Sequence, residues 1–163
     1  MRQGGSATWR RGSALPDAIG LLARLALGGV LLVAGLLKVA SPAQSALAVR
    51  AYRLLPYDAA GYLGYALPIV EIVLALLLLG GLLTRAAAIG GGVLMVAFEI
   101  GIISAWARGL SIDCGCFGGG GTIAASQTHY LEEVLRDAGL LLCAAWLTVR
   151  PRTAYSLDQR LFG

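Results

Sequence analysis

The sequence predicts an all-α membrane protein built as a four-helix transmembrane bundle. Of its 163 residues, 58% are hydrophobic and only 13% are charged. An average soluble domain has about 25% charged residues, so this chain has too little polar surface to cover a globule of its size in water. Four apolar stretches also approach or exceed the roughly 20 residues that a helix needs to cross a bilayer. A soluble enzyme is therefore excluded.

The four stretches are continuous runs rich in Leu, Ala, Val and Gly, without the alternation of barrel strands. They cover residues 18–39, 61–83, 86–107 and 134–149. The first exceeds the roughly 7 to 15 residues of a signal-peptide core and contains Arg24, so we expect an uncleaved helix. The fourth is short, so we expect it to begin near Tyr130, with Glu132 and Glu133 in the interfacial zone.

Basic residues predict the orientation, because cytoplasmic segments carry more Lys and Arg than outer ones. Seven lie on the side of the termini: Arg2, Arg10, Arg11, Arg85, Arg150, Arg152 and Arg160. Five lie on the other side: Lys38, Arg50, Arg53, Arg108 and Arg136. We therefore expect a transmembrane domain over residues 18–150 in the cell membrane, cytoplasmic tails over 1–17 and 151–163, and outward-facing first and third loops.

The first outer loop contains the signals of a short helix. Ser41 is suited to the cap and Pro42 to the first helical position. Apolar residues, with Arg50 and Arg53 among them, continue up to Leu55, and Pro56 would end the helix. We expect an amphipathic helix at the outer interface. Tyrosines that follow it would form an aromatic belt: Tyr57, Tyr62 and Tyr65.

Four ionisable residues fall inside the predicted spans, namely Arg24, Lys38, Glu71 and Glu99. A charge at the bilayer centre costs about 2.5 to 3.5 kcal/mol on insertion scales, so each requires an explanation. Arg24 and Lys38 share one helical stripe, which should face the other helices. Either the cations extend to the two interfaces while Glu71 pairs with one of them or is protonated, or Glu71 or Glu99 accepts protons in redox chemistry.

The loop after the third span carries two cysteines separated by one glycine, Cys114 and Cys116. Such a pair can close a disulfide only where the backbone turns sharply, and Gly115 supplies that freedom. The ring would be smaller than that of a Cys-x-x-Cys motif, so strain should make it easy to reduce, as in an exchanging disulfide.

Neighbouring residues would modify this pair. Glycines after Phe117 offer backbone N–H groups to a thiolate, Arg108 adds positive charge, and Asp113 opposes it. A structural disulfide is one alternative, because the outward face is oxidising. Another is a metal site that uses His129, although Cys143 should lie at mid-membrane, where it makes a poor fourth ligand and is better explained as a packing residue.

Several segments together resemble a known family: Arg24-Leu-Ala-Leu-Gly28, Ala34-Gly-Leu-Leu-Lys38, Tyr52-Arg-Leu-Leu-Pro56, Leu67-Pro-Ile-Val-Glu71 and Asp113-Cys-Gly-Cys-Phe-Gly118. Over residues 21–142 the chain is similar to the MauE branch of the DoxX-like membrane proteins. The resemblance implies a four-helix bundle with a redox-associated role, since MauE proteins are linked to disulfides in the exported small subunit of methylamine dehydrogenase.

The resemblance also implies roles for individual residues. Cys114 and Cys116 become the redox pair, and the intramembrane charges become part of the framework. Arg136-Asp137 departs from the Arg-Asn that the family commonly has before its last span. This departure and the long glycine run leave the substrate, and any connection with methylamine, open.

The leading hypothesis is thiol-disulfide exchange with an exported disulfide-bearing protein or a thioredoxin-like domain. Re-oxidation of the pair needs an electron acceptor, and a quinone between the helices would serve, although no sequence motif marks its site. One alternative is an assembly scaffold for an exported oxidoreductase, with a purely structural disulfide. The other is a small transporter in which Glu71 and Glu99 line a path.

The predicted orientation has a direct test. A membrane-impermeant thiol reagent, applied to intact cells under reducing conditions, should label Cys114 or Cys116 but not Cys143. Mass spectrometry of the purified chain identifies the labelled residue. If the cysteines are labelled only in permeabilised cells, the loop lies on the cytoplasmic side and the predicted orientation is wrong.

Overall fold

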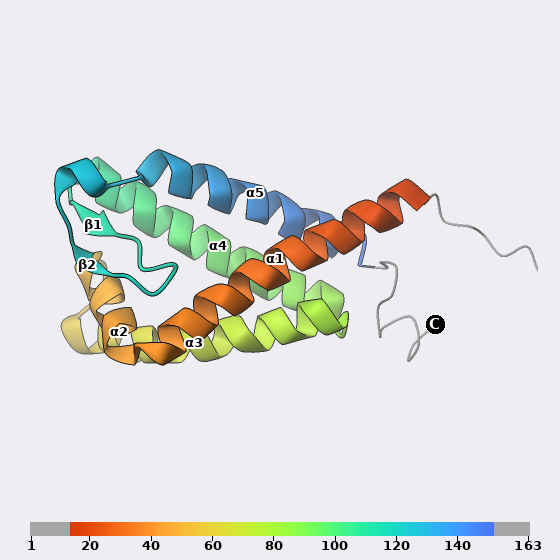
Figure 1. Ribbon diagram of the computed structural model, residues 1–163, viewed down its shortest axis with the longest axis horizontal. Helices are drawn as coiled ribbons and strands as arrows, with labels where there is room; N and C mark the ends of the chain where they lie inside the picture. Colours follow the sequence, from red (N-terminus) through yellow and green to blue (C-terminus); the bar gives the residue numbers. More distant parts are fainter. Residues whose placement is uncertain (1–13, 152–163) are drawn as a thin grey trace, which may run out of the picture.

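The computed structural model describes residues 14–151, and this part of the chain is mostly helical (Figure 1). Its helices are α1 (Ala14–Ala40), α2 (Pro42–Ala51), α3 (Tyr57–Gly80), α4 (Thr84–Ala107) and α5 (Tyr130–Val149). Between α4 and α5 lie two short antiparallel strands and a 3₁₀ turn: β1 (Ile112–Asp113), β2 (Gly121–Thr122) and η1 (Ala125–Gln127). The predicted cytoplasmic tails lie largely outside the described residues, including Arg2, Arg10, Arg11, Arg152 and Arg160.

Three helices are long and apolar enough to cross a membrane: Leu15–Ala40, Tyr57–Gly80 and Thr84–Ala107. Their length and composition support the prediction of a multi-pass membrane protein. The helix α5 begins at Tyr130, as expected, but four charged residues lie in its first eight positions: Glu132, Glu133, Arg136 and Asp137. Because of these charges, α5 is not among the helices that are apolar enough to cross a membrane. A fourth span therefore stays a prediction.

The four long helices pack against one another, α1 on α3 and α5, and α4 on α5 and α3. Their shared core consists of apolar side chains from all four: Leu27, Leu31, Leu78, Met95, Leu140 and Leu147. Large apolar side chains also cover the outward surfaces, such as Leu76 at 57% and Ile100 at 60% exposure. A contiguous surface of this kind is unfavourable in water and suits lipid.

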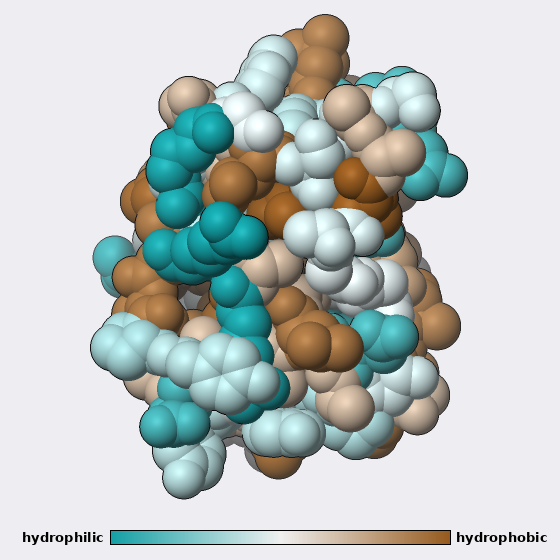
Figure 2. All heavy atoms as spheres, turned by 90° about the vertical axis from the view of Figure 1, so that its left-hand side faces the viewer, coloured by the Kyte–Doolittle hydropathy of each residue, from teal (hydrophilic) through white to brown (hydrophobic). Residues whose placement is uncertain are grey.

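The helices place different structures at their two ends. One end carries α2, the strands and the loop before α5, whereas the α3–α4 turn and both ends of the described chain lie at the other (Figure 1). Figure 2 shows the first end face-on, with hydrophilic side chains gathered on part of it and apolar ones exposed between them. The side of the membrane on which this end lies stays a prediction.

The helix α2 packs closely on the start of α3. It begins at Pro42, with Ser41 at the cap position but without a side-chain cap hydrogen bond, and it ends at Ala51, before the expected Leu55. Ser45 Oγ donates to the carbonyl oxygen of Gly64 over 2.6 Å. That carbonyl needs a donor, because Pro68, four residues later, has no N–H. The interfacial position of α2 stays a prediction.

A buried ion pair joins α1 to α3. Lys38 Nζ donates to Glu71 Oε1, and the side chains are 3% and 0% exposed. The sequence did not decide whether Arg24 or Lys38 pairs with Glu71. In the structure the partner is Lys38. Arg24 is also buried, so the predicted inward stripe of α1 is confirmed. Gly35 allows the contact, because a Cβ there would lie 3.0 Å from the carbonyl oxygen of Pro68.

Removing one member of this pair should destabilise the fold. Glu71→Gln leaves the Lys38 ammonium buried without a counter-charge, which typically costs about 3 to 5 kcal/mol. We expect a lower yield of monodisperse protein in detergent, partly recovered by the double change Glu71→Gln/Lys38→Met. Asp58→Asn, at an exposed position at the start of α3, is the control and should leave the yield unchanged. A normal yield of Glu71→Gln would show that the pair does not support folding.

Candidate functional site

The two cysteines lie in the loop between β1 and β2, at the end of the bundle that carries α2. Gly115 makes the sharp turn between them with a φ of +69°, as the sequence predicted. Its N–H donates to Asp113 Oδ1 over 2.8 Å, which holds the turn. At the base of the loop, the Tyr130 hydroxyl donates to the Leu110 carbonyl over 2.5 Å and accepts from the Ile112 N–H over 3.0 Å. The start of α5 therefore anchors the loop.

The glycines of this loop allow close approach to two helices. A Cβ on Gly115 or on Gly120 would overlap Ala48 of α2, and one on Gly118 would lie 3.1 Å from Leu37 Cβ on α1. The sequence suggested instead that these glycines offer N–H groups to a thiolate. In the structure the N–H of Cys116 donates to Cys114 Sγ over 3.3 Å. The glycine run thus seats the loop against α1 and α2.

The two cysteines have unlike surroundings, and both are free thiols. Cys114 is half-buried, whereas Cys116 is only 7% exposed. The hydrogen bond between the side chains raises the pKa of Cys114, and burial and the charge of Glu133 raise it further. The same hydrogen bond lowers the pKa of Cys116, assisted by the positive charges of Arg136 and Lys38 and opposed by burial and Asp137. These surroundings favour a thiolate on Cys116 over one on Cys114.

Tyr52, after α2, holds the backbone of the pair. Its hydroxyl donates to the carbonyl oxygen of Cys114 over 3.0 Å, and its ring lies against Gly101 of α4, where a Cβ would come within 3.3 Å. Burial raises the pKa of Tyr52, so it acts as a neutral donor. Arg108 donates to the carbonyl oxygens of Tyr52 and Ser104. It therefore ties the end of α2 to α4.

The cation that acts on Cys116 from α5 is Arg136. Its Nε donates to Asp137 Oδ1 over 2.9 Å, and Nη2 lies 2.8 Å from the same oxygen in the ion pair. The guanidinium lies 5.0 Å from the centroid of the Phe117 ring. Asp137 is 2% exposed, and its Oδ2 has no hydrogen-bond partner within residues 14–151. Sequence reasoning counted Arg136 as a topology charge and noted the Arg136-Asp137 pair, but it did not place Arg136 beside the cysteines. No motif connects it to the cysteines, since only the packing of α5 brings it there.

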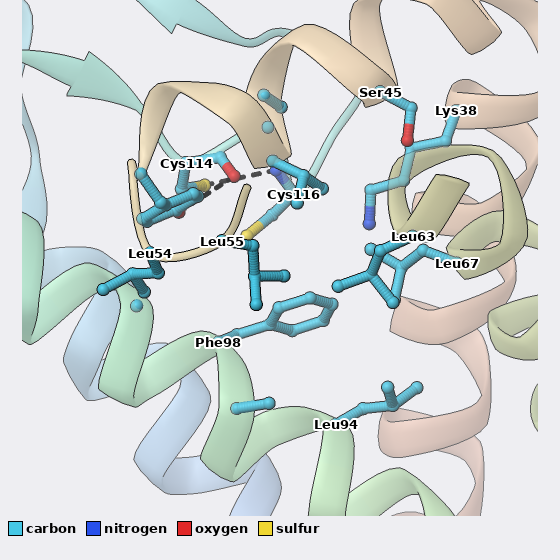
Figure 3. Close-up of a pocket in the computed structure, with 16 residues that line it drawn as sticks. Lys38, Ser45, Leu54, Leu55, Leu63, Leu67, Leu94, Phe98, Cys114 and Cys116 are labelled. Atoms are coloured by element: carbon cyan, nitrogen blue, oxygen red, sulfur yellow. Dashed lines mark hydrogen bonds between the residues drawn. The ribbon is translucent and has the colours of Figure 1, made fainter. Parts of the chain in front are cut away.

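Two cavities adjoin Cys116. The larger, of about 190 Å³, is lined almost entirely by apolar side chains and touches both cysteines and Lys38 (Figure 3). The smaller, of about 10 Å³, lies between the two ion pairs, Lys38 with Glu71 and Arg136 with Asp137. Cys116 therefore separates an apolar cavity from a cluster of buried charges.

The sequence model of one family, described as methylamine utilisation protein MauE, matches residues 16–150. The chain belongs to the MauE family. No match is found among curated proteins or among solved structures. Membership of this family, together with the three apolar helices, is consistent with a membrane protein in methylamine utilisation.

Other residues singled out from the sequence lie away from this MauE cysteine pair. Glu99 is half-buried on α4 and lines neither cavity. Cys143 packs against the main core from α5. His129 is exposed, with its Nδ1 3.7 Å from Glu132 Oε2. Within residues 14–151 no three His, Cys, Asp or Glu side chains are grouped to hold a metal ion.

The charge that sets the reactivity of Cys116 can be tested. In a Cys114→Ser/Cys143→Ala background, Arg136→Met should raise the pKa of Cys116, because a cation that favours its thiolate is lost. Alkylation by iodoacetamide at neutral pH should slow several-fold, and its pH midpoint should move upward. Arg108→Met is the matched control and should leave the midpoint in place. If Arg108→Met shifts the pH midpoint of alkylation as much as Arg136→Met or more, Arg136 is not the cation that sets the reactivity of Cys116.

Proposed function

We propose that this MauE protein carries out thiol-disulfide exchange with an exported partner through Cys114 and Cys116. The single observation that carries the proposal is the asymmetry of the pair. One cysteine is partly exposed, and the other is buried beside cations that favour its thiolate. Exchange requires both an accessible sulfur and a good leaving group, and the two cysteines divide these properties between them.

The asymmetry gives each cysteine a role when the pair is oxidised. A partner thiolate attacks Cys114 Sγ, the Cys114–Cys116 bond breaks, and Cys116 leaves as a thiolate. A second partner thiolate then attacks the partner sulfur of the mixed disulfide and releases Cys114. The partner gains a disulfide, while two electrons pass to the cysteine pair. A low pKa of the leaving thiol speeds the first step.

The proposal includes a DoxX-like bundle of four transmembrane helices, with the cysteine loop outside and both termini in the cytoplasm. The helix α5 has 20 residues, about 30 Å at the helical rise, which matches the hydrocarbon thickness. Asp137 faces the protein interior, and Arg136 pairs with it. These contacts make the charges of α5 compatible with a span. The seven-to-five distribution of basic residues supports the orientation.

The partner is an exported protein with a disulfide to be made or maintained. The family description points to methylamine utilisation as its setting. An assembly scaffold with a structural disulfide is the second candidate, and the close anchoring of the loop by Tyr52, Asp113 and Tyr130 favours it. A transporter path through Glu71 has less support, because the carboxylate of Glu71 is already paired with the ammonium of Lys38.

Exchange and scaffolding differ in their response to loss of one sulfur. In the reverse direction Cys114 attacks the disulfide of an oxidised partner, and Cys116→Ser should accumulate the resulting mixed disulfide, because Cys116 can no longer attack Cys114 Sγ and release the partner thiolate. Cys114→Ser should accumulate far less, since Cys116 is buried. Non-reducing electrophoresis of alkylated membranes, with Cys143→Ser as the control, measures the adduct. Full partner assembly in the Cys114→Ser/Cys116→Ser variant would establish the scaffold instead.

A further inference from the structure

We infer that the apolar cavity beside the cysteines binds the ring of a lipid-soluble quinone, which re-oxidises the pair. The inference rests on the proposed exchange function and names its electron acceptor. It is carried by three features of the cavity, namely its size, the nature of its opening and its contact with Cys116.

The cavity has the size of a substituted aromatic ring. Its volume is about 190 Å³, whereas an engineered cavity of about 150 Å³ in another protein binds benzene. Leu63 and Leu67 of α3 line one wall, Leu94 and Phe98 of α4 line another, and Leu55 lies between them and the cysteine loop (Figure 3). A flat apolar ring fits such walls, while a hydrated charged oxidant would lose its water without compensation.

The rim of the cavity consists of exposed apolar side chains. Leu54, Leu55 and Leu63 are 51%, 47% and 45% exposed, and Ala97 of α4 is also exposed. Exposed leucines at the edge of apolar helices suit contact with lipid. A ligand that enters past them partitions into the bilayer, as a quinone with an apolar tail does. This property separates it from water-soluble disulfides such as oxidised glutathione.

The reactive groups face the cavity. In Figure 3 the sulfur of Cys116 points toward Leu55 and Phe98, and the ammonium of Lys38 projects toward the same space. Lys38 Nζ lies 5.1 Å from the centroid of the Phe98 ring. A quinone ring at this position has a thiol on one side and a cation within reach of a ring oxygen, where negative charge develops during reduction.

The reaction balances without a further reactant. Two S–H bonds break and one S–S bond forms between Cys114 and Cys116. The two electrons and two protons that leave the thiols convert the quinone to the hydroquinone. The hydroquinone then returns to the lipid, and the oxidised pair is ready for the next partner.

The test uses the full chain, reduced, freed of reductant and placed in lipid nanodiscs, with decylubiquinone as the probe. We expect loss of quinone absorbance together with formation of the Cys114–Cys116 disulfide, one equivalent per chain. Ala97→Phe should narrow the opening and slow the reaction at low quinone concentration at least tenfold. Ile100→Phe is the matched control, because Ile100 is exposed on the same helix and does not line the cavity. Equal slowing by both changes, or by neither, would overturn the inference.

A second measurement separates this inference from the proposed function. Oxidised glutathione should oxidise the reduced pair at the same rate in the wild type and in Ala97→Phe, since it approaches from water. Oxidation by glutathione but not by decylubiquinone would overturn the quinone site and leave exchange intact. Failure to react with any disulfide would overturn the exchange function itself. The Cys114→Ser/Cys116→Ser variant cannot transfer electrons but should still bind decylubiquinone. If Ala97→Phe weakens this binding and Ile100→Phe does not, the result supports the site independently of electron transfer.

Discussion

The ion pair of Lys38 and Glu71 determines where the end of the molecule that carries the cysteine loop can lie. Neither charge is stable in an apolar bundle alone, so α1 and α3 must meet at this level. Lys38 is in the last turn of α1, and α2 begins only four residues later. The pair therefore also sets the position of α2, whose Ala48 meets the cysteine loop, while Leu37 beside Lys38 meets Gly118. A contact inside the apolar region thus positions a loop at its edge.

A second ion pair, Arg136 with Asp137, completes the surroundings of Cys116 from α5. With Lys38, it places two cations near one buried sulfur, and their carboxylate partners keep the cluster close to neutral. This balance allows charged groups to remain buried while they still favour a thiolate over a thiol. Asp137 itself adds a negative charge that opposes this effect.

The sequence predicted the features that depend on local pattern, and it missed those that depend on packing. The length of the apolar runs predicted the three apolar helices. The spacing of Arg24 and Lys38 along α1 predicted the side of this helix that is buried. The Cys-Gly-Cys motif located the pair, but Tyr52, Glu133 and Arg136 reach it only through the arrangement of α2, α4 and α5. Arg108 was expected to act on the cysteines because it is close in sequence, yet its guanidinium binds carbonyl oxygens at the end of α2 and on α4.

In the proposed function, the spacing of the cysteines would allow one loop to serve two reactants, a partner thiol and a quinone. The turn at Gly115 presents a half-buried Cys114 and a buried Cys116 whose sulfur faces an apolar cavity (Figure 3). A protein partner needs an accessible sulfur, whereas a ring dissolved in lipid needs one beside an apolar opening. Because the two sulfurs can join within one turn, electrons taken up at one are available at the other without movement of a domain. In the proposed function, a membrane protein with no soluble domain in its described residues would connect an exported thiol to the bilayer in this way.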